Sequence, residues 1–261
     1  MTSSASHSAS PSAPEPEPRE RVLVVGASSG IGAALVRQLA SEGCRVAAVA
    51  RRTELLEELA ASCPEGAVLP FTHDVTAAGE VPALLEQVRA ALGGLDTLVY
   101  VAGVMPLVGA QEYDHGPDRR MVQVNLLGGM AWCAEVARLF VSERRGTIVG
   151  ISSVAGDRGR RMNPAYHASK AGFTTYLESL RNRLEVHGVR VVTIKPGMVE
   201  TPMTAEVEKL VLPITAEQAA RATVRTWRGR LWSTRYVPLV WWPIMRVIQA
   251  LPSRLFRHLE I

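Results

Sequence analysis

Cysteine is scarce in this 261-residue chain, and the cysteines that occur form no recognisable pattern. There are three, Cys44, Cys63 and Cys133, and no two of them have C-x-x-C spacing. An odd number of widely spaced cysteines argues against a disulfide framework and against a cysteine-based metal site. It is typical of reduced thiols in a cytosolic protein, so we expect a cytoplasmic protein without a metal.

Long apolar runs are also missing. No run reaches the roughly 18 to 20 residues that a membrane-spanning helix needs, and the N-terminus lacks the basic start and apolar stretch of a secretory signal. With 47% hydrophobic and 21% charged residues, the composition is that of a soluble globular protein. The length allows a large domain with a substantial buried core.

The chain changes character after residue 20. Residues 1–20 contain mostly Ser, Ala, Pro and Glu without apolar periodicity, which predicts a disordered tail. Residues 21–235 then alternate short apolar runs with helical patterns and contain no internal repeat. We expect six strands, from 21–25 to 189–197, and a long helix over 118–143. Such units predict an α/β fold with a doubly wound parallel sheet (Rossmann fold) in a single domain, followed by an amphipathic helical extension at 236–261.

The stretch GASSGIG, residues 26–32, joins the first predicted strand to the first helix. Turns collect glycine in any protein, so three glycines alone are weak support for a binding site. Between a buried strand and a helix, however, Gly26 permits a tight turn, Gly30 a close approach of backbone to pyrophosphate, and Gly32 close packing of helix on strand. With Ser28, Ser29 and Ile31, these residues predict a dinucleotide-binding loop at a helix N-terminus.

A carboxylate is missing where NAD-binding folds usually have one, at the end of the second strand. The chain there reads VAAVARR, which ends in Arg51 and Arg52. A guanidinium forms charge-assisted hydrogen bonds with a 2′-phosphate, which a carboxylate would repel. The sequence therefore predicts NADP(H) as the cofactor, with Arg51 as the first contact and Arg52 facing solvent. The alternative is that both arginines merely open a surface helix.

Seven short motifs occur in an order that identifies a family resemblance. They are GASSGIG, HDVT at 73–76, VAG at 101–103, VNLLG at 124–128, ISSVAG at 151–156, YHASK at 166–170 and PGMVETPM at 196–203. Over residues 21–205 the chain resembles the short-chain dehydrogenase/reductase family, specifically its single-domain oxidoreductases. The resemblance implies hydride transfer between NADP(H) and a carbonyl or secondary alcohol.

The resemblance also assigns catalytic roles. Tyr166 is the expected acid or base, and Lys170 lies one helical turn further on the same face. The ammonium of Lys170 and the nicotinamide cation are expected to lower the phenol pKa from near ~10, and Lys170 to bind the nicotinamide ribose. Ser153 polarises the substrate oxygen, and Asn125 holds a water that links Lys170 to solvent. Each residue alone has an ordinary structural explanation, but the four together indicate an intact active site.

Further cofactor contacts follow from the resemblance alone. They are expected at Asp74, Val75, Ala102, Gly103, Tyr166, Lys170, Pro196, Gly197, Val199 and Thr201. The family usually has two asparagines before the Ala-Gly pair at 102–103, and here they are replaced by Tyr100 and Val101. The first of those asparagines braces the central sheet, so the sequence leaves this bracing in doubt.

The substrate side is less informative. Residues 204–214, TAEVEKLVLPI, predict a lid helix whose apolar content indicates a hydrophobic ligand. Met105, Pro106 and Leu107 are further candidates for the pocket wall. Arg158, Arg160 and Arg161 are candidates for clamping an anion, but a solvated loop is the interpretation that we favour for them.

The C-terminal segment is basic and apolar. Residues 221–261 contain eight arginines and one acid, and four of the five tryptophans fall between 227 and 242. An apolar stripe, Trp241, Met245, Ile248, Leu251 and Leu255, has helical spacing. Packing on the protein's own core or on a second subunit is the interpretation favoured here, and peripheral contact with a membrane through 236–261 is the alternative. Nucleic acid is not an expected partner, because the segment has no recognition motif.

Three functional readings remain open at this point. The favoured one is an NADP(H)-dependent oxidoreductase acting on a mostly hydrophobic small molecule. A cofactor-binding regulator and a membrane-surface protein with little turnover are the alternatives, since fold alone does not decide function. The family resemblance also implies a homodimer or homotetramer, assembled through the long helices near 120–140 and 164–186.

Overall fold

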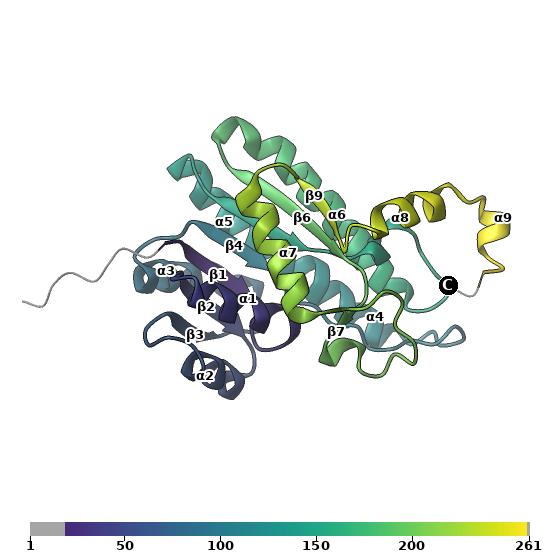
Figure 1. Ribbon diagram of the computed structural model, residues 1–261, viewed down its shortest axis with the longest axis horizontal. Coiled ribbons are helices and arrows are strands. Elements are labelled where there is room, and N and C mark those ends of the chain that lie inside the picture. Colours follow the sequence, from purple (N-terminus) through teal and green to yellow (C-terminus); the bar gives the residue numbers. More distant parts are fainter. Residues whose placement is uncertain (1–18, 260–261) are drawn as a thin grey trace, which may run out of the picture.

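A seven-stranded parallel sheet lies at the centre of the molecule, as seen in the computed structural model, which describes residues 19–259 (Figure 1). The strand order is β3-β2-β1-β4-β5-β6-β9. The strands are β1 Arg21–Val25, β2 Arg45–Ala50, β3 Val68–Thr72, β4 Thr97–Tyr100, β5 Thr147–Ile151, β6 Arg190–Pro196 and β9 Thr234–Val237. A separate small pair is formed by β7 Val199–Glu200 and β8 Ile214–Thr215.

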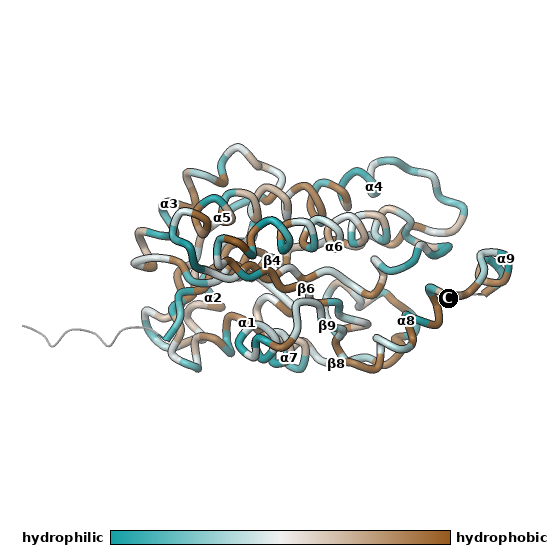
Figure 2. The backbone as a smooth tube through the Cα atoms, turned by 90° about the horizontal axis from the view of Figure 1, so that it is seen from above, coloured by the Kyte–Doolittle hydropathy of each residue, from teal (hydrophilic) through white to brown (hydrophobic). Residues whose placement is uncertain are grey.

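Helices cover both faces of this sheet, which gives three layers (Figure 2). One face carries α1 Gly30–Ser41, α2 Thr53–Ala61 and α7 Ala216–Gly229. The other face carries α3 Val81–Leu92, α4 His115–Val122, α5 Gly129–Glu143 and α6 Pro164–Leu184. Two short helices, α8 Trp241–Ala250 and α9 Ser253–Phe256, follow β9 at one end of the molecule. The remaining short turns are η1 Ala78–Glu80, η2 Gln123–Gly128, η3 Val154–Asp157, η4 Glu185–His187 and η5 Pro202–Thr204.

The strands read as continuous apolar runs because both of their faces are buried. In β1, Val22 and Val24 join the core beneath α1 and α7, whereas Leu23 and Val25 join the core beneath α3, α5 and α6. Burying one such side chain completely contributes about 1.5–3 kcal/mol. The doubly wound parallel sheet predicted from the sequence is confirmed.

The order of the strands reverses between β1 and β4, which are neighbours in the sheet. Chain connections leave β1 toward β2 on one side, and β4 continues toward β5 on the other. In open parallel sheets, a crevice forms at such a point, beyond the carboxyl ends of the strands. The glycine loop follows β1 and therefore borders this crevice.

Two boundaries differ from the expectations. Residues 1–18 of the expected tail lie outside the described residues, but Arg19 and Glu20 are part of the fold: Arg45 N donates to Glu20 O over 2.9 Å. A seventh strand, β9, pairs with β6 and crosses the expected boundary at residue 236. Sequence analysis missed β9 because it has four residues and begins with Thr and Arg.

The expected long helix is present as one run over His115–Glu143, with a π-helical turn at Gln123–Gly128. This helix is long and apolar enough to cross a membrane, which the sequence analysis did not anticipate. Half of its most apolar window is buried inside the protein, and Trp132 and Phe140 are fully buried against the sheet. We therefore assign it as a core helix of the domain.

The apolar stripe of the C-terminal segment packs mainly on the protein itself. Trp241, Met245 and Ile248 are buried in one cluster with Val154 and Tyr236. This cluster agrees with the interpretation favoured from the sequence, packing on the protein's own core. The far end of the stripe is not buried, because the Leu255 side chain is 60% exposed.

Candidate active site

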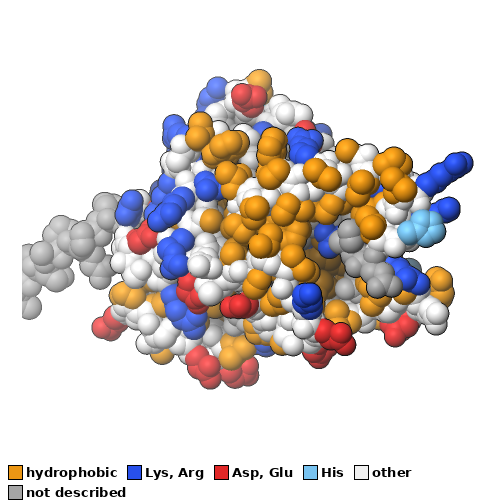
Figure 3. Space-filling model, turned by 45° about the vertical axis from the view of Figure 1, so that its right-hand side comes forward, with side chains coloured by type: hydrophobic (Ala, Val, Ile, Leu, Met, Phe, Trp, Pro, Cys, Tyr) orange, Lys and Arg blue, Asp and Glu red, His pale blue; other side chains and the backbone are white. Residues whose placement is uncertain are grey.

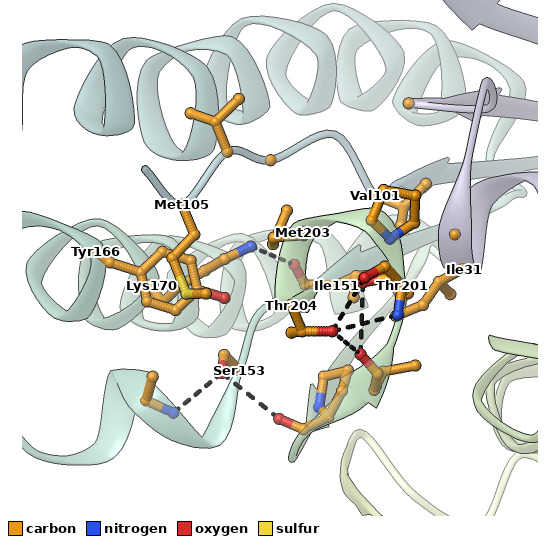
Figure 4. A pocket seen from close by; sticks show the side chains of 18 of the residues that line it. Ile31, Val101, Met105, Ile151, Ser153, Tyr166, Lys170, Thr201, Met203 and Thr204 are labelled. Atoms are coloured by element: carbon orange, nitrogen blue, oxygen red, sulfur yellow. Dashed lines mark hydrogen bonds between the residues drawn. The ribbon is translucent and has the colours of Figure 1, made fainter. Parts of the chain in front are cut away.

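A cavity of about 920 Å³ occupies the crevice beyond the carboxyl ends of the strands. Its wall combines the glycine loop, the ends of β4 and β5, the start of α6 and the segment that follows β6 (Figure 4). Figure 4 shows Ser153, Tyr166 and Lys170 together with Met105 and Met203 around one part of this cavity. The volume lies in the range of small-molecule and cofactor sites.

The glycine loop has the geometry of a phosphate cradle. Gly26 has φ 101°, and a Cβ atom there would overlap the backbone of Ala102. A Cβ atom on Gly32 would overlap the carbonyl oxygen of Gly26. Helix α1 begins at Gly30, so its first N–H groups have no partner within the helix and face an anion favourably. The loop therefore fits the pyrophosphate of a dinucleotide.

Two arginines stand beside the loop at the end of β2. The Arg52 guanidinium donates to the hydroxyls of Ser28, over 2.8 Å, and Ser29, over 2.9 Å. It therefore lies beside the glycine loop, and its side chain is exposed, in agreement with the expectation that it faces solvent. The Arg51 guanidinium lies 3.6 Å from the Asp74 carboxylate.

Asp74 is held outside the cavity wall. Its Oδ1 accepts hydrogen bonds from the backbone N and the hydroxyl of Thr76, at 2.9 and 2.8 Å. These bonds and the neighbouring Arg51 and Arg120 lower its pKa against the opposing effect of burial. Val75, the next residue, lines the cavity. Most other residues expected to contact the cofactor also line it: Gly26, Ser28, Ser29, Gly30, Ile31, Gly32, Arg51, Arg52, Ala102, Gly103, Tyr166, Lys170, Pro196, Gly197, Val199 and Thr201.

Ser153, Tyr166 and Lys170 meet at the other end of the cavity. Ser153 follows β5, and its hydroxyl accepts from Ala155 N over 3.0 Å. Tyr166 and Lys170 lie on the first turns of α6, and Lys170 Nζ is 5.8 Å from the centre of the phenol ring. Lys170 Nζ donates to the carbonyl of Ile151 over 3.1 Å. Ser152 is engaged elsewhere, since its hydroxyl donates to the Lys170 carbonyl over 3.0 Å.

Asn125 sits behind this group, fully buried in the π-helical turn. Its side chain accepts from Val104 N over 2.8 Å and donates to Val104 O over 3.0 Å. A Cβ atom on Gly103 would lie 3.4 Å from Asn125 Oδ1 and 3.5 Å from Lys170 Nζ. The amide and the ammonium therefore border the same space, as a relay between them requires. Helical irregularities of this type often occur at functional sites.

Tyr100 supplies the bracing that the sequence left in doubt. Its ring is fully buried, and its hydroxyl donates to the carbonyl of Val124 over 2.6 Å. Val124 directly precedes Asn125, so this bond ties β4 to the turn that positions the amide. The ring also makes an edge contact with Phe173, with centroids 5.6 Å apart.

Burial has the largest effect on the pKa values of Tyr166 and Lys170. It lowers the pKa of Lys170 to about 8. It also raises the pKa of Tyr166, and a hydrogen bond with the Ser153 hydroxyl only partly opposes this. The sequence analysis expected the lysine to lower the phenol pKa. The ammonium instead lies nearly 6 Å from the ring centre and faces the Ile151 carbonyl, so desolvation of the phenolate prevails.

The part of the cavity expected to bind the substrate is apolar, but the segment predicted to cover it has a different structure. Met105 and Leu107 line the cavity as predicted, and sequence reasoning missed Met162, His167, Met198 and Met203. The predicted lid helix at 204–214 is wrong. This segment is irregular because its ends are held by the pairing of β7 with β8, and Leu212 has φ 50°. The methionines among the missed residues are not regularly spaced in the sequence, so no periodic pattern identifies them as cavity residues.

Comparison with known proteins agrees with this geometry. The family model described as short chain dehydrogenase matches residues 20–211. A protein of Myxococcus xanthus named as an uncharacterised oxidoreductase is 41% identical over 188 residues, which cover 70% of this chain and 73% of the relative. Another uncharacterised oxidoreductase, from Mycobacterium tuberculosis, is 30% identical over 249 residues, which cover 91% of this chain and 96% of the relative.

Solved structures share the fold. A short chain dehydrogenase from Burkholderia cenocepacia J2315, determined in complex with NADP, superimposes with a TM-score of 0.80 at 23% identity. The superposition covers 93% of this chain and 98% of that one. Since the family model spans most of the chain and the active-site motifs meet in one cavity, this protein belongs to the short-chain dehydrogenase/reductase family.

Proposed function

We propose that this oxidoreductase uses NADP(H) to interconvert a carbonyl group and a secondary alcohol in a mostly hydrophobic small molecule. The observation that carries the proposal is the meeting of Ser153, Tyr166 and Lys170 with a phosphate-binding glycine loop in one cavity. Its apolar wall near these residues supports a substrate with a hydrophobic body.

The roles of the side chains follow from their positions. When bound, the nicotinamide cofactor supplies or accepts the hydride. Tyr166 donates its hydroxyl proton to the substrate oxygen in reduction and takes it back in oxidation. Ser153 hydrogen-bonds the same oxygen. Lys170 is charged below its pKa of about 8, holds the ribose, and favours the phenolate that remains after proton transfer.

Asn125 completes the proton path in this proposal. Its amide is fixed by Val104 and faces the same space as Lys170 Nζ. A water held there connects the ammonium to solvent, so that Tyr166 regains its proton after each reduction. The rigid amide matters because a misplaced relay slows proton transfer.

The test of this function is NADPH oxidation with ketones, aldehydes, quinones and 3-oxo compounds, with Tyr166→Phe measured in parallel. We expect turnover by the wild type and a loss of at least about 100-fold in kcat for Tyr166→Phe, the lower end of typical general acid contributions. The alternative, a cofactor-binding regulator with little turnover, is supported if NADPH binds tightly but no compound is reduced.

Preference for NADP(H) over NAD(H) rests on Arg51 and Arg52. Both line the cavity, and the Burkholderia structure with the same fold, which was determined in complex with NADP, supports this preference. We expect Arg52→Gln to weaken NADPH binding by about 10-fold or more with little effect on NADH, because a charge-assisted bond to the 2′-phosphate is lost. Arg138→Gln, on the exposed side of α5, is the matched control. Equal affinity of the wild type for NADH and NADPH contradicts the preference.

A second candidate function is peripheral contact with a membrane. The outer side of the C-terminal segment exposes Leu239, Val240, Trp242 and Val247, and hydrophobic side chains gather on this end of the molecule (Figure 3). Arg246, on the same helix, has its guanidinium 5.8 Å from the Trp242 ring. Apolar side chains among arginines suit an anionic lipid surface.

Truncating the segment is unsuitable as a test, because β9 and Trp241 belong to the folded core. We instead propose Trp242→Ser with Val247→Ser, and Val186→Ser, at another exposed apolar position, as the control. Co-sedimentation with phosphatidylserine vesicles is expected for the wild type and for the control but not for the double variant. Protein that remains in the supernatant contradicts this function.

A cytoplasmic location and assembly as a homodimer or homotetramer complete the proposal. The free cysteines support the location, and the family membership supports the assembly. Analytical ultracentrifugation measures the assembly directly, and a monomer at micromolar concentration contradicts it.

A further inference from the structure

Three arginines follow the Ser153 turn, and the structure gives them three different environments. Arg158 donates to the carbonyls of Ile248 and Leu251 and stacks 4.0 Å from the Phe256 ring centre, so it fastens the C-terminal segment. Arg161 is exposed. Arg160 lines the cavity and is largely covered. The sequence interpretation of all three as a solvated loop is therefore wrong for Arg158 and Arg160.

Among residues 19–259, no anion is paired with the Arg160 guanidinium. Its Nε is buried and has no hydrogen-bond partner, and its guanidinium forms no hydrogen bond or ion pair within residues 19–259. The nearest acidic influence is Asp157, whose carboxylate is already bound by Lys195 and by the Tyr236 hydroxyl. Leaving a covered charge unpaired costs free energy, and proteins normally compensate it.

The surroundings of Arg160 place it on the substrate side of the cavity. It lines the cavity from the loop between Ser153 and Tyr166, two of the residues that form the candidate active site. Its charge lowers the pKa of His167, the residue next to Tyr166, in addition to the larger effect of burial. His167 is itself tied to the Ala155 carbonyl, at 2.7 Å from its Nδ1. The wall of the same cavity also includes apolar side chains: Met105, Leu107, Met162 and Met203.

We propose that Arg160 is the binding site for a carboxylate on the substrate. This inference rests on the proposed oxidoreductase function and narrows its substrate class to carbonyl compounds, or the corresponding alcohols, that combine an apolar body with a carboxylate. A guanidinium binds a carboxylate through two parallel hydrogen bonds, which fixes the orientation of the ligand as well as its position. The methionines accommodate the apolar body, because their unbranched side chains adapt to irregular shapes.

Acidic residues at the cavity mouth offer one competing explanation. Glu206 and Glu208 line the cavity from the irregular segment after η5, and both are exposed. A movement of this segment could bring either carboxylate to Arg160, which would then be a structural partner. The experiment has to separate this arrangement from binding of a substrate carboxylate.

The first test compares medium-chain 2-oxo acids with their methyl esters as substrates for NADPH-dependent reduction. The variant is Arg160→Met, and Arg161→Met is the matched control, with the same change of charge in the same loop but at an exposed position. We expect the acid-to-ester ratio of kcat/KM to fall by about 10-fold to 100-fold in Arg160→Met, the loss typical of hydrogen bonds to a charged group. Arg161→Met is expected to keep the wild-type ratio.

The outcomes distinguish this inference from the proposed function. A wild type that reduces esters and neutral ketones but shows no preference for the acids overturns the inference and leaves the proposed function intact. Equal losses in the Arg160 and Arg161 variants also overturn it, because they show only a general effect of charge.

A second test needs no turnover. The NADP⁺-loaded Tyr166→Phe protein is titrated calorimetrically with the same 2-oxo acids, with and without Arg160→Met. Binding that weakens by about 10-fold in the Arg160 variant supports the inference even if no substrate is reduced. Unchanged binding overturns it. The inference is also overturned if Glu206→Gln with Glu208→Gln lowers the thermal stability of the wild type but not that of Arg160→Met, since that coupling identifies the glutamates as the partners of Arg160.

Discussion

The buried cluster of Asp157, Lys195 and Tyr236 connects the C-terminal strand to the turn that starts at Ser153. The Asp157 side chain is 1% exposed, forms an ion pair with Lys195, and accepts a hydrogen bond from the Tyr236 hydroxyl over 2.7 Å. Tyr236→Phe removes only this hydroxyl and retains the ring, so no cavity is created. A hydrogen bond to a charged group contributes about 1.5–3 kcal/mol, and we expect the free energy of unfolding to fall by that amount.

Asp157→Asn is expected to cost more. It leaves the Lys195 ammonium, 9% exposed, without a negative partner, and breaking a buried ion pair in this way typically costs about 3–5 kcal/mol. The difference between the two variants separates the contribution of the hydroxyl from that of the ion pair.

Urea unfolding followed by fluorescence measures both effects, with the midpoint shifting at an unchanged slope. For a chain of this size, the Tyr236→Phe loss corresponds to a fall in Tm of about 3–12 °C. Tyr113→Phe is the control, since Tyr113 is 92% exposed and its hydroxyl has little to lose. A Tyr236→Phe protein within about 0.5 kcal/mol of wild type, the range of ordinary surface substitutions, refutes the reasoning.

Three further predictions concern the active site. Burial lowers the pKa of Lys170 to about 8, so the side chain loses its positive charge above that pH. We therefore expect kcat/KM for reduction to decline as the pH rises through about 8. A kcat/KM that stays constant up to pH 10 contradicts this. Tyr100→Phe removes the hydroxyl that donates to the Val124 carbonyl over 2.6 Å. We expect the free energy of unfolding in urea to fall by about 1–3 kcal/mol and kcat to fall as well. An unchanged kcat would show that Asn125 keeps its place without this bond. Gly32→Ala forces a methyl group onto the Gly26 carbonyl, and calorimetric titration should show loss of NADPH binding, whereas retained affinity would mean that the loop adjusts.

Local pattern was sufficient to predict much of this protein. The continuous apolar strands, the glycine loop and the spacing of Tyr166 and Lys170 depend on neighbours in the chain, and periodicity and steric constraints act over such short distances. The doubly wound sheet follows from these units, because parallel strands joined by helices have few other ways to pack. Almost all residues that the sequence predicts as cofactor contacts therefore line one cavity.

Long-range contacts decided the remainder. The sequence alone did not indicate that Thr234–Val237 would pair with β6, or that Tyr100 would replace an asparagine brace by reaching Val124. Nor did it show that β7 and β8 would hold residues 204–213 as a loop. Each of these outcomes depends on a partner that is remote in sequence, so propensity was overridden by packing.

The arginines after Ser153 show this division most clearly. In sequence, Arg158, Arg160 and Arg161 form a basic loop with nothing to distinguish one from another. In the folded protein, the first binds carbonyls of the C-terminal segment, the second lines the cavity without a partner among residues 19–259, and the third is exposed. The sequence by itself determined the charge of this loop and its place beside Ser153. Only the tertiary structure decided which guanidinium faces the cavity, because burial and pairing depend on chain segments that are distant in sequence.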